Sequence, residues 1–118
     1  MKAIVSKSEL LTHKRIFEKA AKPKKGMANK TSVILTVSDK FTVAGPGLNH
    51  AMECRAVAWG RTSLPYNIWK RLMQTLRFTL ESDVTIEAED GKIEIDKLSI
   101  NNAKIQVVKT VPPGEGKL

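Results

Sequence analysis

The residues of this sequence that are best suited to chemistry are lysines and arginines spaced like the faces of helices. They fall in two segments, and together with one glutamine they form the set Lys14, Arg15, Lys19, Lys22, Lys70, Arg71, Gln74 and Arg77. Cations that recur at helical spacing share one side of a helix and form a stripe that can follow a row of phosphates. The pattern therefore predicts a partner that carries phosphate groups.

The positive charge is concentrated near the N-terminus. The chain has a formal net charge of +8, and residues 1–30 hold nine Lys and Arg residues against two Glu residues. The remaining residues hold eleven cations against ten acids, so that part is nearly neutral. Such concentration favours an anionic partner near the first third of the chain. A solvated helix followed by a basic loop is the alternative interpretation.

Catalytic and metal-binding chemistry have little support in the sequence. His50 and Cys54 are four residues apart in a predicted strand, so they should face the same side. A zinc site normally takes four protein ligands, or three and a water, and His13 lies far away in sequence. Cys54 is expected to be a small buried apolar residue, and no third group is marked that could orient a Cys–His nucleophile pair. Residues 44–48 lack the Lys and Ser/Thr of a phosphate-binding loop. We therefore expect no enzymatic activity, no metal and no cofactor.

A predicted hairpin over residues 83–96 concentrates negative charge. Its acids are Asp83, Glu87, Glu89, Asp90, Glu94 and Asp96. Strand alternation places several of them on one solvated face, which is the ordinary role of such residues. Self-association, in which the hairpin meets a basic segment of a neighbouring copy, is the alternative.

The first set of cations requires a helix, which the apolar spacing predicts from Glu9 to Lys22 after a strand over residues 2–5. Ser6 or Ser8 can cap the start of this helix, and Pro23 ends it. The predicted apolar face consists of Leu10, His13, Phe17, Ala20 and Ala21. The opposite face consists of Arg15, Glu18, Lys19 and Lys22, with Lys14 at its edge.

The second set of cations requires a helix from Pro65 to Phe78. Pro65 suits the first helical position, where its missing N–H costs nothing. The residues predicted to be buried are Ile68, Trp69, Leu72, Met73 and Leu76. The opposite face carries Asn67, Lys70, Arg71, Gln74 and Arg77.

Alternating apolar residues predict the remaining strands, over residues 31–37, 41–43, 50–59, 61–64, 83–89, 93–100 and 103–109. Asp90-Gly91 is a strong hairpin signal, and Asn101-Asn102 can turn because Asn tolerates positive φ. Residues 45–47 form a loop, because proline cannot donate to a strand ladder.

An internal repeat organises these elements. Residues 33–43 align with residues 84–94 at an offset of 51, which places Asp39 on Asp90. A strand and a helix precede each copy, and another strand follows it. The sequence therefore predicts an α+β domain made of a duplicated β-α-β-β-β unit, with antiparallel sheets and both helices packed on one side.

Length and composition favour one soluble domain. The chain has 118 residues, 42% of them hydrophobic, and one cysteine, which excludes an internal disulfide framework. The N-terminal apolar run is too short for a signal peptide, and no apolar stretch is long enough to span a bilayer. We therefore expect a cytoplasmic protein without a membrane partner.

The duplicated order resembles one domain of the DNA sliding clamps, above all the bacterial polymerase processivity factors. Residues 1–5 followed by 8–11 look like the first strand and helix of a clamp, and residues 33–43 look like its first hairpin. Residues 60–65, with Ile68 and Leu72, look like the strand that leads into its second helix, and residues 84–95 look like its second hairpin. The resemblance covers residues 1–109 as a single domain and leaves 110–118 as a flexible C-terminal tail.

This resemblance implies a non-catalytic module that binds double-stranded DNA without reading its sequence, because clamp helices line a ring around the duplex. Arg15, Lys19 and Lys22 of the first helix would face DNA, and so would Lys70, Gln74 and Arg77 of the second. Lys14 and Arg71 would lie at the edges of those faces.

The resemblance also implies a homo-oligomer, a replication or repair protein as a further partner, and a role in DNA replication. Bacterial clamp subunits join three such domains and eukaryotic ones join two, so six copies of this chain would close a ring of that kind. The alternative is a protein-interaction module of clamp fold, which binds a replication or repair protein without encircling DNA.

Overall fold

The computed structural model describes residues 1–20, 31–45 and 47–111. Lys22 and the other residues of 21–30 lie outside this part, as does most of the predicted tail. The elements follow in the order β1 (Lys2–Ser6), α1 (Lys7–Ala20), β2 (Ser32–Val37), β3 (Lys40–Gly45), β4 (Leu48–Glu53), β5 (Arg55–Ala58), β6 (Gly60–Pro65), α2 (Tyr66–Gln74), the 3-10 helix η1 (Thr75–Phe78), β7 (Asp83–Glu89), β8 (Lys92–Ile95), β9 (Leu98–Asn101) and β10 (Gln106–Lys109).

The strands form two antiparallel sheets of five strands each, which confirms the α+β class. One sheet has the order β5-β1-β7-β8-β9, and the other has the order β10-β6-β2-β3-β4. Each sheet takes three strands from one half of the chain and two from the other. The first strand of each half pairs with the second strand of the other half, as Ala3 does with Ile86 and Leu64 with Val33. The halves therefore interlock.

The predicted strand over residues 50–59 is wrong, because the chain changes sheets at Cys54. Strand β4 pairs with β3 in one sheet, whereas β5 pairs with β1 in the other. The two strands belong to different sheets, and the chain passes from one sheet to the other at Cys54, between the end of β4 and the start of β5. His50 and Cys54 consequently do not share a strand, which corrects the expectation that they face the same side of one.

The predicted strand over residues 93–100 is likewise two strands. A turn at Asp96 and Lys97 separates β8 from β9, and these strands pair with each other. Asp96 has φ 54°, a left-handed conformation that Asp tolerates better than most residues. The last strand begins at Gln106 rather than Ala103, because residues 103–104 form the turn.

The repeat unit is therefore β-α-β-β-β-β, one strand longer than predicted, and it occurs twice. The offset of 51 matches buried Val33, Leu35 and Val37 to buried Val84, Ile86 and Ala88. After the hairpin turn the offset becomes 52, since Val37 pairs with Phe41 whereas Ala88 pairs with Ile93. The second turn is one residue longer. The predicted alignment of residues 33–43 with 84–94 at a constant offset of 51 is therefore correct only before the turn.

Helix α1 begins two residues earlier than predicted. The hydroxyl of Ser6 accepts a hydrogen bond from the backbone N–H of Glu9 at 3.2 Å, so Ser6 caps the helix as one of the two candidates predicted. Leu10, His13 and Phe17 are fully buried on the predicted apolar face.

Helix α2 begins at Tyr66, one residue later than predicted. Pro65 has ψ 141° and pairs with Ser32 in the sheet, so the ladder holds it in extended geometry as the last residue of β6. The α-helix ends at Gln74, and a 3-10 turn continues to Phe78. Trp69, Leu72, Met73 and Leu76 are buried as predicted, whereas Ile68 is only half-buried.

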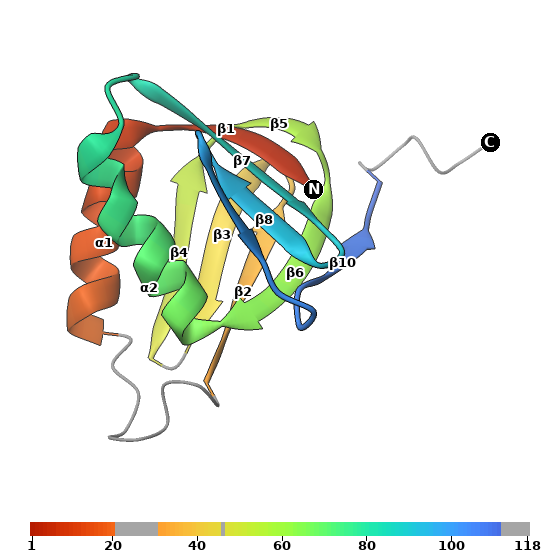
Figure 1. Cartoon of the computed structure of the whole chain (residues 1–118). Helices are drawn as coiled ribbons and strands as arrows, with labels where there is room; N and C mark the ends of the chain where they lie inside the picture. The colour runs from red at the N-terminus through yellow and green to blue at the C-terminus, as the bar shows by residue number, and fades with distance from the viewer. Residues whose placement is uncertain (21–30, 46, 112–118) are drawn as a thin grey trace.

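Both helices lie on the same side of the sheets, as the duplication predicted (Figure 1). They are at the left in that view, and the N-terminus lies at the opposite side. The core between helices and sheets is mainly aliphatic, with Trp69, Phe17 and Phe41 as its largest members. No described helix has the length and apolarity needed to cross a membrane.

Candidate nucleic-acid interface

The two helices are antiparallel neighbours. The rings of Phe17 and Tyr66 stack with centroids 5.0 Å apart, which joins the end of α1 to the start of α2. At the other end, the Lys7 ammonium donates a hydrogen bond to the backbone carbonyl of Thr79. Because these contacts run in opposite order along the two helices, the helices are antiparallel, and they lie side by side at the left of Figure 1.

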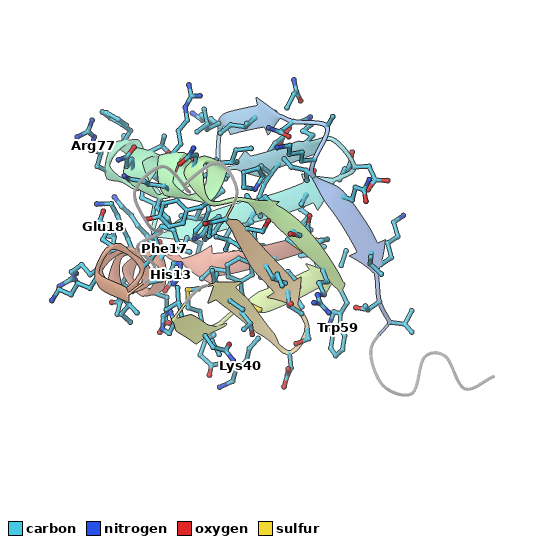
Figure 2. The ribbon with its side chains drawn as sticks, turned by 90° about the horizontal axis from the view of Figure 1, so that it is seen from below. His13, Phe17, Glu18, Lys40, Trp59 and Arg77 are labelled. Atoms are coloured by element: carbon cyan, nitrogen blue, oxygen red, sulfur yellow. The ribbon has the colours of Figure 1, made fainter. Side chains whose placement is uncertain are left out.

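A polar chain inside the core fixes the rotation of both helices. The indole N–H of Trp69 on α2 donates to Nε2 of His13 on α1 at 3.1 Å. Nδ1 of His13 lies 3.0 Å from Nδ1 of His50 on β4, and the two imidazoles stack. Figure 2 shows His13 and Phe17 on the sheet side of α1, and Arg77 on the outside. With His13 and Trp69 held inward, helical geometry directs the cations outward.

The donors and acceptors of this chain determine the protonation of His13. An indole N–H can only donate, so Nε2 of His13 must accept and Nδ1 carries the proton. His50 then accepts at its own Nδ1. Burial, followed by repulsion from His50, lowers the pKa of His13 from 6.5 to about 4. His13 is therefore a neutral structural residue at physiological pH.

The outer face of α1 carries Arg15 and Lys19, and both are exposed. Lys14 is half-buried and forms an ion pair with Glu18 at 3.2 Å, one helical turn away. Of the predicted set on this helix, the structure therefore places two cations at the surface and one in a local ion pair. Lys22 lies outside the described residues.

The outer face of α2 and η1 is more uniformly positive. Lys70, Arg71, Gln74 and Arg77 are all exposed. No Asp or Glu occurs anywhere from Tyr66 to Phe78. The four residues predicted for this helix are therefore brought together on one surface, beside Arg15 and Lys19 of α1.

Charge is segregated between the helices and the rest of the described chain. The helical segments Lys7–Ala20 and Tyr66–Phe78 hold seven Lys and Arg residues against two Glu residues. The other described residues hold eight Lys and Arg residues against nine acids. A surface with this imbalance attracts polyanions toward the helices and away from the sheets.

Two lysines neutralise part of the charge of the acidic hairpin, one from β1 and one from the hairpin itself. Glu87 pairs with Lys2 at 3.5 Å, and Glu94 pairs with Lys92 at 2.5 Å. Glu87 and Glu94 are cross-strand neighbours in the ladder, so the two lysines relieve a direct repulsion. These contacts fit the solvated face expected of the hairpin.

Metal binding and thiol chemistry gain no support from the described residues. Among them, no three His, Cys, Asp or Glu side chains gather as metal ligands would. The Sγ of Cys54 lies 3.9 Å from the carbonyl oxygen of Asp39. Burial, aided by the charges of Glu53 and Asp39, raises the pKa of the Cys54 thiol, which disfavours the reactive thiolate.

Two exposed apolar residues lie at the end of this surface, and the sequence pattern does not predict their exposure. Phe78 is 69% exposed and Leu80 is 96% exposed. The Arg77 guanidinium lies over the Phe78 ring, 4.7 Å from its centroid. The helical period ends in a 3-10 turn here, so periodicity does not show on which side Phe78 lies. The adjacent Arg-Phe pair was the only available signal.

Comparison with solved structures identifies the fold. The Helicobacter pylori beta clamp bound to a DNA ligase peptide matches with TM-score 0.67 and 18% identity, over 92% of this chain and 31% of that one. A putative DNA polymerase III beta subunit from Eubacterium rectale matches with TM-score 0.64 and 22% identity, over 86% of this chain and 29% of that one. The sliding clamp from Caulobacter crescentus matches with TM-score 0.63 and 13% identity, over 98% and 34%.

This chain therefore has the fold of one sliding-clamp domain, as the sequence resemblance indicated. It spans about a third of the length of the clamp chains that it matches. No family model and no curated protein matches the sequence.

Proposed function

We propose that this clamp-like domain is a non-catalytic module that holds double-stranded DNA against the outer faces of α1 and α2 without reading its sequence. The observation that carries the proposal is the charge of the two helical segments: seven cations against two Glu residues, with no acid from Tyr66 to Phe78. The fold supports it, since the matched structures are DNA polymerase clamps.

Phosphate contact explains why sequence readout is not expected. Lysine and arginine side chains that neutralise phosphates release counterions, which makes the affinity fall steeply with salt. Contacts of this kind position a protein on the duplex but do not distinguish bases. Arg15, Lys19, Lys70, Arg71 and Arg77 are the described residues that we assign to this role, and Gln74 can donate to a phosphate from between them.

A paired charge reversal tests the proposal. The double variant Lys19→Glu with Lys70→Glu is expected to lower the affinity for a duplex by about tenfold or more and to flatten the dependence of log K on log salt. Both residues are exposed, so the fold should tolerate the change. Fluorescence anisotropy with a labelled duplex, repeated across a salt series, measures both quantities.

The matched control reverses two cations on the sheet side. Lys104→Glu with Lys109→Glu makes the same change in net charge at exposed positions away from the helices. If this control weakens binding as much as the helix variant does, the effect is one of overall charge and the assignment to the helices is wrong. If the unaltered chain has no affinity for duplex at low salt, the proposed function is wrong.

Self-association is part of the proposal, and the sheet edges support it. Strand β4 ends one sheet and pairs with β3 at six consecutive positions, and β9 ends the other sheet with four. Edge β5 differs, since its pairing with β1 contains a register shift of the kind that blunts edges. Regular edges on different sheets permit head-to-tail pairing of copies, which closes into rings when the rotation allows.

Light scattering over a range of protein concentrations measures this assembly. We expect masses that are multiples of 13.1 kDa and that rise with concentration. A mass of one chain at every concentration would contradict self-association while leaving DNA binding untouched.

A second candidate function is docking of a replication or repair protein. It is favoured by the exposed side chains of Val57, Val108 and Val111. Val57 and Val111 line a hollow of about 500 Å3 together with Trp59. Titration with a labelled clamp-binding peptide, such as the ligase peptide bound by the Helicobacter pylori clamp, tests it. Docking is supported if the peptide binds saturably, if Val57→Lys weakens that binding, and if added DNA does not change it. Absence of peptide binding counts against docking.

A further inference from the structure

The end of the basic surface carries a feature that holding a plain duplex does not require. Phe78 ends η1 with 69% of its surface exposed, directly after Arg77. An exposed phenylalanine costs free energy in water and gains nothing from phosphates. Because Phe78 lies at the end of a phosphate-binding stripe, we expect it to contact an apolar, planar group of the ligand whose phosphates the stripe binds.

Phe78 is presented as one layer of a stack. The guanidinium of Arg77 lies over the ring at 4.7 Å, which restrains the side chain. A planar cation on an aromatic ring makes a platform of the type on which unpaired nucleobases stack, because every base has a π-face. The same guanidinium can contact the phosphate of the nucleotide that it stacks beside.

A hollow adjoins this platform. It has a volume of about 310 Å3, and Phe78 forms one wall with Leu98 and Ile95, while Thr75, Asp96 and Lys97 supply polar groups. Apolar walls with a few polar groups suit a nucleobase, whose faces are apolar and whose edge forms hydrogen bonds. The hollow lies where the acid-free stretch from Tyr66 to Phe78 ends.

The charge beyond Phe78 changes sign. Glu81 and Asp83 follow Leu80, and both acids are exposed. Phosphates held along α2 would be repelled there, so the nucleic-acid backbone should leave the surface at Arg77. At that point an unpaired base can rotate out of the DNA duplex without breaking a base pair.

We propose that Phe78 and the adjoining hollow receive an unpaired nucleobase of the DNA held by α1 and α2, so that the preferred ligand is a duplex with an unpaired base. The inference rests on the proposed function. It assigns to the surface a class of DNA ligand that charge alone does not select, and it names Phe78 as the residue that selects this ligand.

The test compares two labelled DNAs of about 20 base pairs, one fully paired and one with a looped-out 2-aminopurine. Base stacking on aromatic side chains contributes about 1–3 kcal/mol per base, so the looped-out probe should bind at least about fivefold more tightly. Phe78→Ala should remove this preference and leave the affinity for the paired duplex unchanged. Phe78→Tyr, which keeps the ring, should retain the preference.

Leu80→Ala is the matched control, because Leu80 is the more exposed of the two neighbouring apolar residues. It should retain the preference, and 2-aminopurine fluorescence should change on binding to this control and to the unaltered chain but not to Phe78→Ala. Equal affinities for the two probes, with normal binding of the paired duplex, would overturn the inference and leave the proposed function standing. No binding of the paired duplex would instead overturn the proposed function.

Discussion

Replacing Trp69 with alanine is expected to lower the free energy of unfolding by about 3–5 kcal/mol, as found for large aromatic residues in cores. Trp69 is fully buried and is the largest residue in the core. Its ring contacts those of His13 and Phe41, with centroids 5.8 and 6.1 Å away. The loss is a large fraction of the 5–15 kcal/mol that stabilises a typical domain, so urea denaturation followed by circular dichroism should show it clearly.

Two further variants separate packing from hydrogen bonding. Trp69→Phe keeps most of the apolar contact but leaves Nε2 of His13 buried without its donor, which should cost about 1–3 kcal/mol for the unsatisfied group. Trp59→Ala is the control, since Trp59 is the chain's other tryptophan and is only half-buried. If Trp59→Ala costs as much as Trp69→Ala, the core described around α2 is wrong.

Acidification is expected to destabilise the domain through His13. The folded state holds the pKa of His13 at about 4, below its ordinary value of 6.5. Between these two values the unfolded chain binds a proton that the folded chain does not, so stability rises with pH there. Lowering the pH from 6.5 to 4 should therefore remove up to about 3 kcal/mol, and this contribution is constant above pH 6.5.

The physical cause is that protonated His13 cannot satisfy its neighbours. A proton on Nε2 would oppose the indole N–H of Trp69, and the charge would be buried. The measurement is the free energy of unfolding against pH for the unaltered chain and for His13→Gln. Because groups that do not contact His13 titrate equally in both, the difference between the two curves reports on His13 and its contact with His50. Parallel curves between pH 4 and 6.5 would contradict the expectation.

Much of the fold could be predicted because local chemistry repeats. Val33, Leu35 and Val37 alternate in a way that only a strand with one buried face uses, and all three are fully buried. The cap at Ser6 and the turn at Gly91, which has φ 81°, depend on residues close in sequence. The outward cations of α2 followed from the same helical spacing that placed Trp69 in the core.

The missed features depend on contacts that local patterns do not contain. The break at Cys54 exists because β4 and β5 pair in different sheets, although the residues on both sides favour strand. The hydrogen bonds between His13, His50 and Trp69 join residues 37 and 56 positions apart. For the same reason, the sequence placed His13 on the apolar side of α1 but did not reveal its partners.

The sequence by itself determined which segments are mainly helix and which are mainly strand, the buried face of each helix and the duplication, because backbone geometry repeats every 3.6 residues in a helix and every two in a strand. Tertiary structure alone decided that each half lends its first strand to the sheet of the other, and that the helices lie antiparallel as one basic surface. It also decided that Phe78 and a hollow stand at the end of that surface. Strand pairing and helix packing are set by the burial of apolar faces between segments distant in sequence, so no short stretch of the chain contains them.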